Sequence, residues 1–339
     1  MFAGFEHITQ GDDDDGCAES LFVNVGPKPD ASALAPDDKP SPPTPPPLVR
    51  ATKSPPPSEE FKRRCLEFNQ IHTKAHTESE ILRISTLPQH LSSGEANPLW
   101  LEARLNKFTG SVVGALFGNN PYETPEDAIS KLVWKTPFLG NEMTQWGNEH
   151  EDDCQAAYAL ATQTSPSAIS NPGLMLSKDF GQFAMSPDGI VPTENRLLEF
   201  KCPFRKKWAT ESQIRENPDL YLRKHVRGST VGTVPIPHYY FDQITWGMGL
   251  LGLSSCDFAV WCPVASAEIE EIGRHGTNCR TVMTPRGTVQ ITRVAFEQDY
   301  YDRMKKEMLR LWNEVYVPAC VWRDAECLNQ PDLRPTLTI

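Results

Sequence analysis

Apolar residues recur at helical spacing in the first half of the chain and gather into short runs in the middle. Between residues 58 and 162, apolar positions repeat every three to four residues, which predicts helices. Between residues 174 and 202, short apolar runs bounded by turn residues predict adjacent strands. The remaining pattern predicts a helix, two strands and a long amphipathic helix, over 238–252, 256–262, 286–294 and 295–316. This order predicts an α/β fold, with a central mixed sheet flanked by helices.

Turn and capping residues refine these elements. Helices are predicted over 58–74, 97–108, 111–118, 124–134 and 146–162, and strands over 174–177, 183–191 and 196–202. The helix at 146 begins with acidic residues, which suit a helix N-terminus, so Glu149 and Asp152 are assigned to that role. In the last helix, a stripe of apolar residues at helical spacing predicts core packing by Phe296, Tyr300, Met304, Met308 and Leu311.

The first 57 residues differ from the rest in composition. They contain DDDD at 12–15 and twelve of the thirty prolines, including the run SPPTPPP at 41–47. Such a segment buries too little apolar area to offset its chain entropy, and we expect a disordered tail. Its proline runs favour either a solvated linker or a ligand for SH3- or WW-like partners. The predicted organisation is a tail over 1–57 and one domain over 58–330.

Charge and cysteine content limit the function classes. The formal net charge of −11 gives no overall basic signature, but residues 1–60 hold 11 acidic against 4 basic side chains, so the rest is close to neutral. A near-neutral body can still present a basic face. The nine cysteines form no CxxC pair, which argues against a disulfide scaffold. With no signal-like N-terminus and no run of 18 apolar residues, we expect an intracellular protein that is neither secreted nor membrane-bound.

The stretch SPDGIVPTENRLLEFKC, residues 186–202, carries the candidate chemistry. Asp188 lies in a turn, while Glu199 and Lys201 are two residues apart on a strand and therefore share a face. A tight hairpin would bring Asp188 beside Glu199, and two adjacent carboxylates suit a divalent cation such as Mg²⁺. A neighbouring lysine could then position water for phosphodiester hydrolysis. The alternative is a surface hairpin with a turn Asp and a Glu–Lys pair, although a strand this apolar rarely carries charges without a task.

These residues resemble the PD-(D/E)xK nuclease signature in the form found in the lambda exonuclease and YqaJ-type viral recombinase family, which is related to viral alkaline exonucleases. Four further segments resemble the same family in the same order, ARLNKFTGS (103–111), WGNEHE (146–151), YYFDQITWGM (239–248) and CDFAVWCP (256–263). Together the segments span about residues 97–316, and each is weak alone whereas the ordered set is specific. The resemblance implies a restriction-endonuclease-like core.

The resemblance also implies a role for each matching side chain. The family joins a metal, an attacking water and a terminal DNA phosphate in one site, and the matching residues are Asp188, Glu199 and Glu151 for the metal, Lys201 and Gln243 for catalysis, and Arg104 and Ser111 for the 5′-phosphate. The implied cofactor is Mg²⁺, and Mn²⁺ is expected to substitute. Two features depart from the family pattern: Thr245 stands where a second Gln is common, and residues 205–236 form a longer, more basic segment.

The implied activity is exonucleolytic digestion of one strand of duplex DNA, 5′ to 3′, which leaves a 3′ single strand for recombination or replication. Implied partners are DNA with free ends, a single-strand annealing protein and further copies in a trimer, and the implied location is the cytoplasm or the nucleus of a host. The alternatives are a structure-specific endonuclease or resolvase on the same core and a non-catalytic DNA-processing scaffold.

Several other residues have competing interpretations. The segment after the catalytic strand holds basic residues that contact either phosphate or only solvent, Arg205, Lys206, Lys207, Arg215, Arg223, Lys224 and Arg227. Cys202 is expected to point away from the metal and to pack in the core. His72 and His76 lie four residues apart, but without a third ligand they are expected to be solvated and not to bind metal.

Overall fold

The computed structural model describes residues 58–91, 96–136, 140–220 and 236–324. The predicted tail over 1–57 and the last six residues of the predicted domain lie outside these ranges. No helix in the described ranges combines the length and apolarity needed to cross a bilayer.

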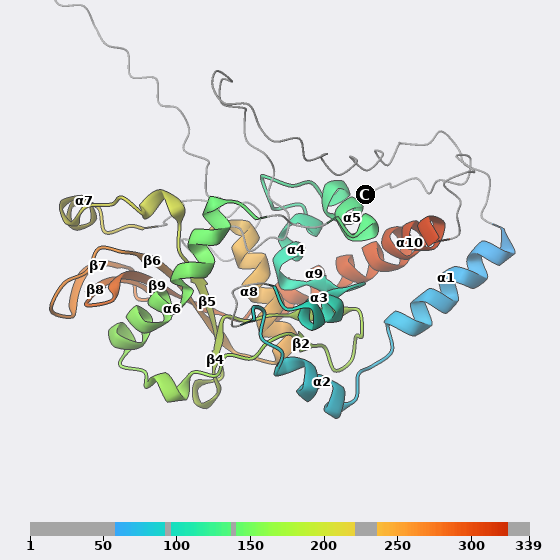
Figure 1. Ribbon diagram of the computed structural model, residues 1–339, viewed down its shortest axis with the longest axis horizontal. Helices are drawn as coiled ribbons and strands as arrows, with labels where there is room; N and C mark the ends of the chain where they lie inside the picture. The colour runs from blue at the N-terminus through green and yellow to red at the C-terminus, as the bar shows by residue number, and fades with distance from the viewer. Residues whose placement is uncertain (1–57, 92–95, 137–139, 221–235, 325–339) are drawn as a thin grey trace, which may run out of the picture.

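Two sheets form the centre of the fold (Figure 1). The larger has six strands in the order β4-β5-β6-β9-β8-β7, with bounds Gly189–Val191, Arg196–Lys201, Ser255–Cys262, Gly287–Ala295, Cys279–Thr284 and Glu270–His275. The smaller has three strands in the order β1-β3-β2, with bounds Phe108–Thr109, Phe183–Met185 and Met175–Leu176. Within the larger sheet, β5 and β6 are parallel and the other neighbours are antiparallel. The predicted mixed sheet is therefore confirmed.

Helices cover both faces of the larger sheet. Their bounds, α1 to α10 in chain order, are Glu59–His72, Glu78–Ser85, Pro98–Arg104, Gly110–Leu116, Pro125–Trp134, Glu142–Thr162, Glu211–Glu216, His238–Leu251, Gln298–Leu311 and Val317–Asp324. Helix α6 packs against β5, β6, β8 and β9, whereas α8 packs against β5, β6 and the smaller sheet. Helix α1 lies against α10, and Trp312 Nε1 donates to Asn69 Oδ1 at 2.9 Å. The α/β fold with flanking helices is confirmed.

Most predicted helices are confirmed, but two have different bounds: the helix predicted over 97–108 ends at Arg104, before strand β1, and α6 begins before residue 146. Thr124 caps α5, accepting a hydrogen bond from the Asp127 amide. Helix α6, however, begins at Glu142, because the side chain of Asn141 accepts a hydrogen bond from the Thr144 amide. Glu149 and Asp152 therefore lie in the middle of the helix, and their assignment to its N-terminus was wrong.

The strand predictions need two corrections. Residues 183–191 were predicted as one strand, but they form β3 of the smaller sheet and β4 of the larger, because the chain turns at Ser186–Asp188. Strands β7 and β8 were not predicted at all. Most of β7 is charged and exposed, as the edge strand of a sheet often is, and its sequence therefore lacks an apolar alternation.

The helix predicted over 295–316 packs as expected. Tyr300, Met304, Met308 and Leu311 are buried in the main core, and Phe296 packs against it. After α9 the helix widens into one π-helical turn over Trp312–Tyr316 before α10.

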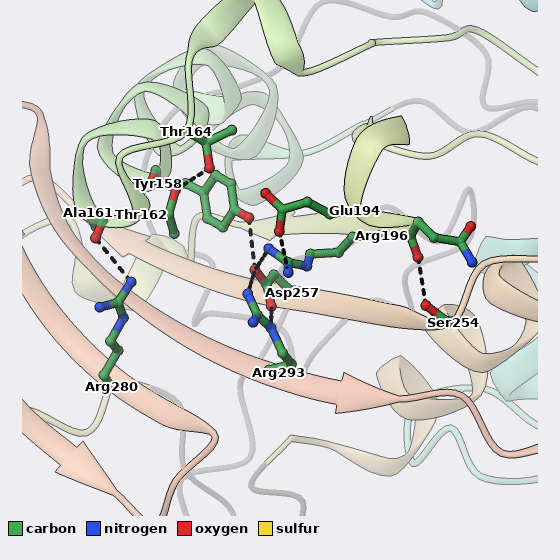
Figure 2. A network of polar contacts seen from close by, with 11 residues as sticks. Tyr158, Ala161, Thr162, Thr164, Glu194, Arg196, Ser254, Asp257, Arg280 and Arg293 are labelled. Atoms are coloured by element: carbon green, nitrogen blue, oxygen red, sulfur yellow. Dashed lines mark hydrogen bonds and ion pairs between the residues drawn. The ribbon is translucent and has the colours of Figure 1, made fainter.

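A buried carboxylate joins four elements on the α6 side of the sheet (Figure 2). Asp257 of β6 is fully buried and accepts hydrogen bonds from Tyr158 Oη of α6 at 2.8 Å and from Arg196 Nη1 of β5 at 3.2 Å. Arg293 of β9 donates to both carboxylate oxygens, at 2.8 and 2.9 Å. Because a buried charge is tolerated only when it is paired and hydrogen-bonded, this network fixes α6 on the strands.

Candidate active site

The β4–β5 hairpin places the candidate carboxylates side by side. The strands pair antiparallel with Gly189 opposite Leu198, so Asp188, one residue earlier, comes to the level of Glu199. Asp188 is buried, and its Oδ2 accepts a hydrogen bond from the Phe200 amide at 2.5 Å. The hairpin predicted from the sequence is confirmed, and the backbone of β5 fixes the orientation of Asp188.

Side chains of β5 alternate between the two faces of the sheet. Leu198, Phe200 and Cys202 pack in the cluster that includes residues of α6. Glu199 and Lys201 have the opposite parity, and they lie toward α8. The prediction that Cys202 packs in the core is confirmed, and its Sγ donates to the His150 carbonyl at 3.3 Å.

Glu199 and Lys201 form an ion pair inside the protein. Lys201 Nζ lies 2.7 Å from Glu199 Oε1, and the two side chains are 1% and 0% exposed. The Lys201 ammonium also lies 5.1 Å from the centre of the Tyr240 ring. Burying two charges costs several kcal/mol of desolvation per ion. Because of this desolvation cost, a buried ion pair adds little to the stability of the fold. Its presence here therefore indicates a catalytic or binding role.

Gln243 of α8 completes the surroundings of Glu199. Its Nε2 donates to Glu199 Oε1 at 2.6 Å, so this oxygen receives both the amide and the ammonium. The structure thus joins Gln243 to the Glu199–Lys201 pair of β5. Thr245, which stands where the family often has a second Gln, is fully buried in the same helix.

The carboxylates of the site act electrostatically on the neighbouring strand. The pKa of the Cys256 thiol on the neighbouring strand is raised well above its ordinary value, first by burial and then by the charges of Glu199, Asp257 and Asp188. The carboxylates of Asp188 and Glu199 supply hard oxygen donors. These donors fit Mg²⁺, which uses one or two protein carboxylates and fills its other positions with water and phosphate oxygens.

Glu151 is placed differently from the other two carboxylates. It is half-buried on α6, where its charge contributes to the raised pKa of the Cys202 thiol, after a hydrogen bond with Cys154, burial and the charge of Cys154. Cys202 is on the α6 side of β5, opposite to the side of Glu199. In the described ranges, no group of three or more His, Cys, Asp or Glu side chains is arranged to hold a metal ion. A metal role for Glu151 therefore stays a prediction.

Arg104 and Ser111, which the resemblance assigns to one phosphate, meet in the structure. Arg104 ends α3, and its Nη2 donates to Ser111 Oγ in the first turn of α4 at 3.1 Å. The same nitrogen donates to Thr109 Oγ1 at 3.0 Å, and the guanidinium carbon lies 4.3 Å from the centre of the Trp100 ring. The sequence did not predict the contact of Thr109 with Arg104, because no local pattern marks this threonine as a functional residue.

Gly110 connects this pair to the carboxylates. A Cβ at Gly110 would lie 2.2 Å from Met185 Sδ and 3.7 Å from Gln243 Cγ. Only a glycine lets α4 approach α8 this closely without displacing Met185. Gly110, the residue before Ser111, therefore lies close to Gln243, and Gln243 in turn binds Glu199.

The two histidines form no metal site with each other. Lys107 Nζ lies 3.3 Å from His76 Nε2 and donates to the Gly181 carbonyl at 2.6 Å. The pKa of His76 is lowered, mainly by burial and then by Lys107. An ammonium in contact with the ring opposes a second cation. The histidines are nevertheless half-buried, so the expectation that both are solvated was wrong.

The basic segment after β5 divides into two parts. Arg205 and Lys207 are exposed and Lys206 is half-buried, directly after the catalytic strand. Arg215 instead forms ion pairs with Glu211 and Glu270, an arrangement that links α7 to β7. The other three basic residues of this segment, Arg223, Lys224 and Arg227, lie outside the described residues.

Comparison with known proteins gives one family match. Residues 99–254 match the model of the YqaJ-like viral recombinase domain, and all seven candidate site residues lie in this range. No protein of curated function matches the chain.

Several solved structures are similar to this chain. An alkaline exonuclease, LHK-Exo, from Laribacter hongkongensis has 19% identity and a TM-score of 0.45, with 69% of this chain and 97% of that chain covered. A phage-related exonuclease from Haemophilus somnus 129PT has 13% identity and a TM-score of 0.33, with 76% and 99% covered. The shutoff and exonuclease protein of Kaposi's sarcoma-associated herpesvirus has 13% identity and a TM-score of 0.37, with 65% and 69% covered.

Proposed function

Because residues 99–254 match the model of the YqaJ-like viral recombinase domain, we propose that the chain is a metal-dependent deoxyribonuclease that digests one strand of linear duplex DNA from its end. The observation that carries this proposal is the buried Glu199–Lys201 pair, with Asp188 on the adjoining strand and Gln243 on α8. A structural hairpin does not need charges at 0% and 1% exposure, whereas phosphodiester hydrolysis needs carboxylates and a cation at one point.

Each side chain has a defined part in the proposal. Asp188 and Glu199 would hold Mg²⁺, which when bound supplies Lewis-acid polarisation of a phosphoryl oxygen and a more acidic water. The Phe200 amide orients the Asp188 carboxylate, and Gln243 fixes one oxygen of Glu199. By the resemblance, Glu151 of α6 would be a further ligand of the metal.

Lys201 acts on the attacking water and the phosphate. Its ammonium, held 2.7 Å from Glu199 Oε1, can donate a hydrogen bond to a water or to a non-bridging phosphate oxygen. In this position the ammonium stabilises the negative charge that develops on the phosphate in the transition state. The low local dielectric makes this contact stronger than it would be in water.

Arg104 and Ser111 bind the terminal phosphate. The guanidinium is a planar donor that suits phosphate oxygens, and the Ser111 and Thr109 hydroxyls lie within 3.1 Å of it. Through Gly110 this cluster adjoins Gln243, so a bound end would lie next to the carboxylates. This arrangement favours digestion from an end over internal cutting.

The finer features follow from the family. We propose 5′ to 3′ polarity, a 3′ single-stranded product for recombination or replication, an annealing protein as the partner that receives it, and a trimer as the working assembly.

The experiment compares linear, nicked circular and closed circular duplex DNA in Mg²⁺, with EDTA as the control. The expected result is loss of linear DNA alone, release of mononucleotides, and no cleavage in EDTA. Conversion of the closed circle to nicked or linear forms would instead identify an endonuclease. Binding without cleavage of any substrate would identify a non-catalytic scaffold.

A further inference from the structure

An exposed indole follows the catalytic strand. Trp208 is 69% exposed and lies seven residues after Lys201, just beyond the 3₁₀ turn over Phe204–Lys206. Its ring meets the Phe204 ring edge-on, with centroids 5.4 Å apart. Tryptophan carries one of the largest apolar surfaces of any side chain, and burial normally recovers it. An indole presented to solvent in the segment that directly follows β5 therefore suggests a ligand.

A lysine holds this indole in place. Lys207 Nζ lies 5.0 Å from the centre of the Trp146 ring, 5.1 Å from that of Phe204 and 5.4 Å from that of Trp208. Trp146 belongs to α6 and also meets Phe204 edge-on at 6.2 Å. Cation–π contacts to three rings restrain the segment and anchor it to α6. The indole is therefore part of an ordered platform, which we define as Trp146, Phe204, Lys207 and Trp208.

The charges around the platform select the kind of partner. Arg205, Lys206 and Lys207 immediately precede Trp208. Lysine is depleted in the cores of protein–protein interfaces, whereas basic residues interleaved with an exposed aromatic are typical of surfaces that bind single-stranded nucleic acid. There, the cations follow the phosphates and the ring stacks on a base.

We propose that Trp208 stacks on an unpaired base of the DNA. This inference rests on the proposed function, because it takes DNA as the substrate. Digestion of one strand leaves the other unpaired at the active site, and stacking would hold that junction open. Since every base has a π-face, the contact does not depend on sequence.

The test measures binding of a fluorescein-labelled single-stranded oligonucleotide and of a blunt duplex, by anisotropy in EDTA so that no cleavage intervenes. Trp208→Ala is expected to weaken single-strand binding by about 5- to 140-fold, which is the effect of one lost base–aromatic stack. Trp208→Phe should retain most of the affinity, whereas Trp208→Leu should behave like Trp208→Ala. The slope of log K against log salt should not change, because no phosphate contact is removed.

The matched control is Leu82→Ala on α2, an exposed apolar side chain at 67% whose loss should leave affinity unchanged. Wild-type affinity in Trp208→Ala overturns the proposal, and so does equal affinity in the Leu and Phe variants, which would indicate an apolar contact of another kind. A wild-type protein that does not bind the single strand also overturns it. A wild-type protein that binds but never cleaves contradicts the proposed nuclease and leaves the stacking intact.

Discussion

Removal of the Arg104 guanidinium should abolish much of the preference for a phosphorylated DNA end. Arg104→Ala takes away the donor that now reaches both Thr109 Oγ1 and Ser111 Oγ, and it leaves two small hydroxyls that can bond to water. Arg104 is not one of the residues that would hold the metal, so the rate of the chemical step itself should be unaffected.

The magnitude follows from the contact that is lost. A hydrogen bond to a charged group contributes about 1.5–3 kcal/mol, which corresponds to about 10- to 100-fold in affinity. The guanidinium is half-buried and lies against Trp100, so it is already oriented for binding. Its loss should therefore reduce the affinity for the phosphate by a factor within that range. Arg104→Lys keeps the charge but not the planar fork, and it should recover only part of the preference.

The assay compares initial rates on 5′-phosphorylated and 5′-hydroxyl linear duplexes at one fixed salt concentration. The matched control is Arg63→Ala, an exposed arginine on α1 that pairs with Glu60. The expected result is a smaller rate ratio in Arg104→Ala alone, with an unchanged dependence on Mg²⁺ concentration. If wild type shows no phosphate preference, or Arg104→Ala keeps all of it, the end is recognised elsewhere and an endonuclease becomes the better account.

Three further predictions concern stability and organisation. A truncation that starts at Ser58 keeps the N-cap of α1 and should digest DNA at the wild-type rate; inactivity in a folded truncation would show that the tail belongs to the enzyme. Asp257→Ala leaves Arg196 buried without that partner and should lower the free energy of unfolding by about 3–5 kcal/mol, whereas the more exposed Glu194→Ala should cost less than about 1 kcal/mol in the same urea titration. Burial raises the pKa of Asp242 to about 7, so the folded state retains a proton that the unfolded state releases near pH 4, and stability falls as pH rises from about 4 to 7. Asp242→Asn should therefore reduce the loss of unfolding free energy between pH 5 and 8 by roughly 2–3 kcal/mol, and an unchanged pH dependence would refute the assignment.

The sequence predicted best where the information is local. The spacing of Glu199 and Lys201 fixes their shared face on any strand, and the short connection before Arg196 favours the hairpin that carries Asp188 to them. Arg104 and Ser111 were brought together by the family resemblance, and in the structure they form a hydrogen bond.

Other contacts depend on packing between distant segments and could not be read from a pattern. Residues 183–191 look like one strand in the sequence. In the structure, β3 pairs in the smaller sheet and β4 in the larger, and the chain turns between them at Ser186–Asp188. The Gln243 contact with Glu199 joins residues 44 apart and came solely from resemblance to a family. The need for glycine at position 110 also could not be read from the sequence, because it depends on the packing of Met185 and Gln243 around that position.

The most direct test of the active site is a comparison of cleavage and binding in Lys201→Ala and Asp188→Ala. Both variants should lose Mg²⁺-dependent digestion of linear duplex DNA, while each still binds that DNA measurably, because neither residue supplies the bulk of the phosphate contacts. Lys178→Ala, an exposed lysine, is the control and should digest at the wild-type rate.

Lys201→Ala leaves Glu199 buried without its ammonium, at a cost of about 3–5 kcal/mol, so the assay is run where circular dichroism shows each variant to be folded. Folded variants that bind DNA and do not cleave it are the result we predict. Near-normal turnover by either folded variant would contradict the assignment of this site.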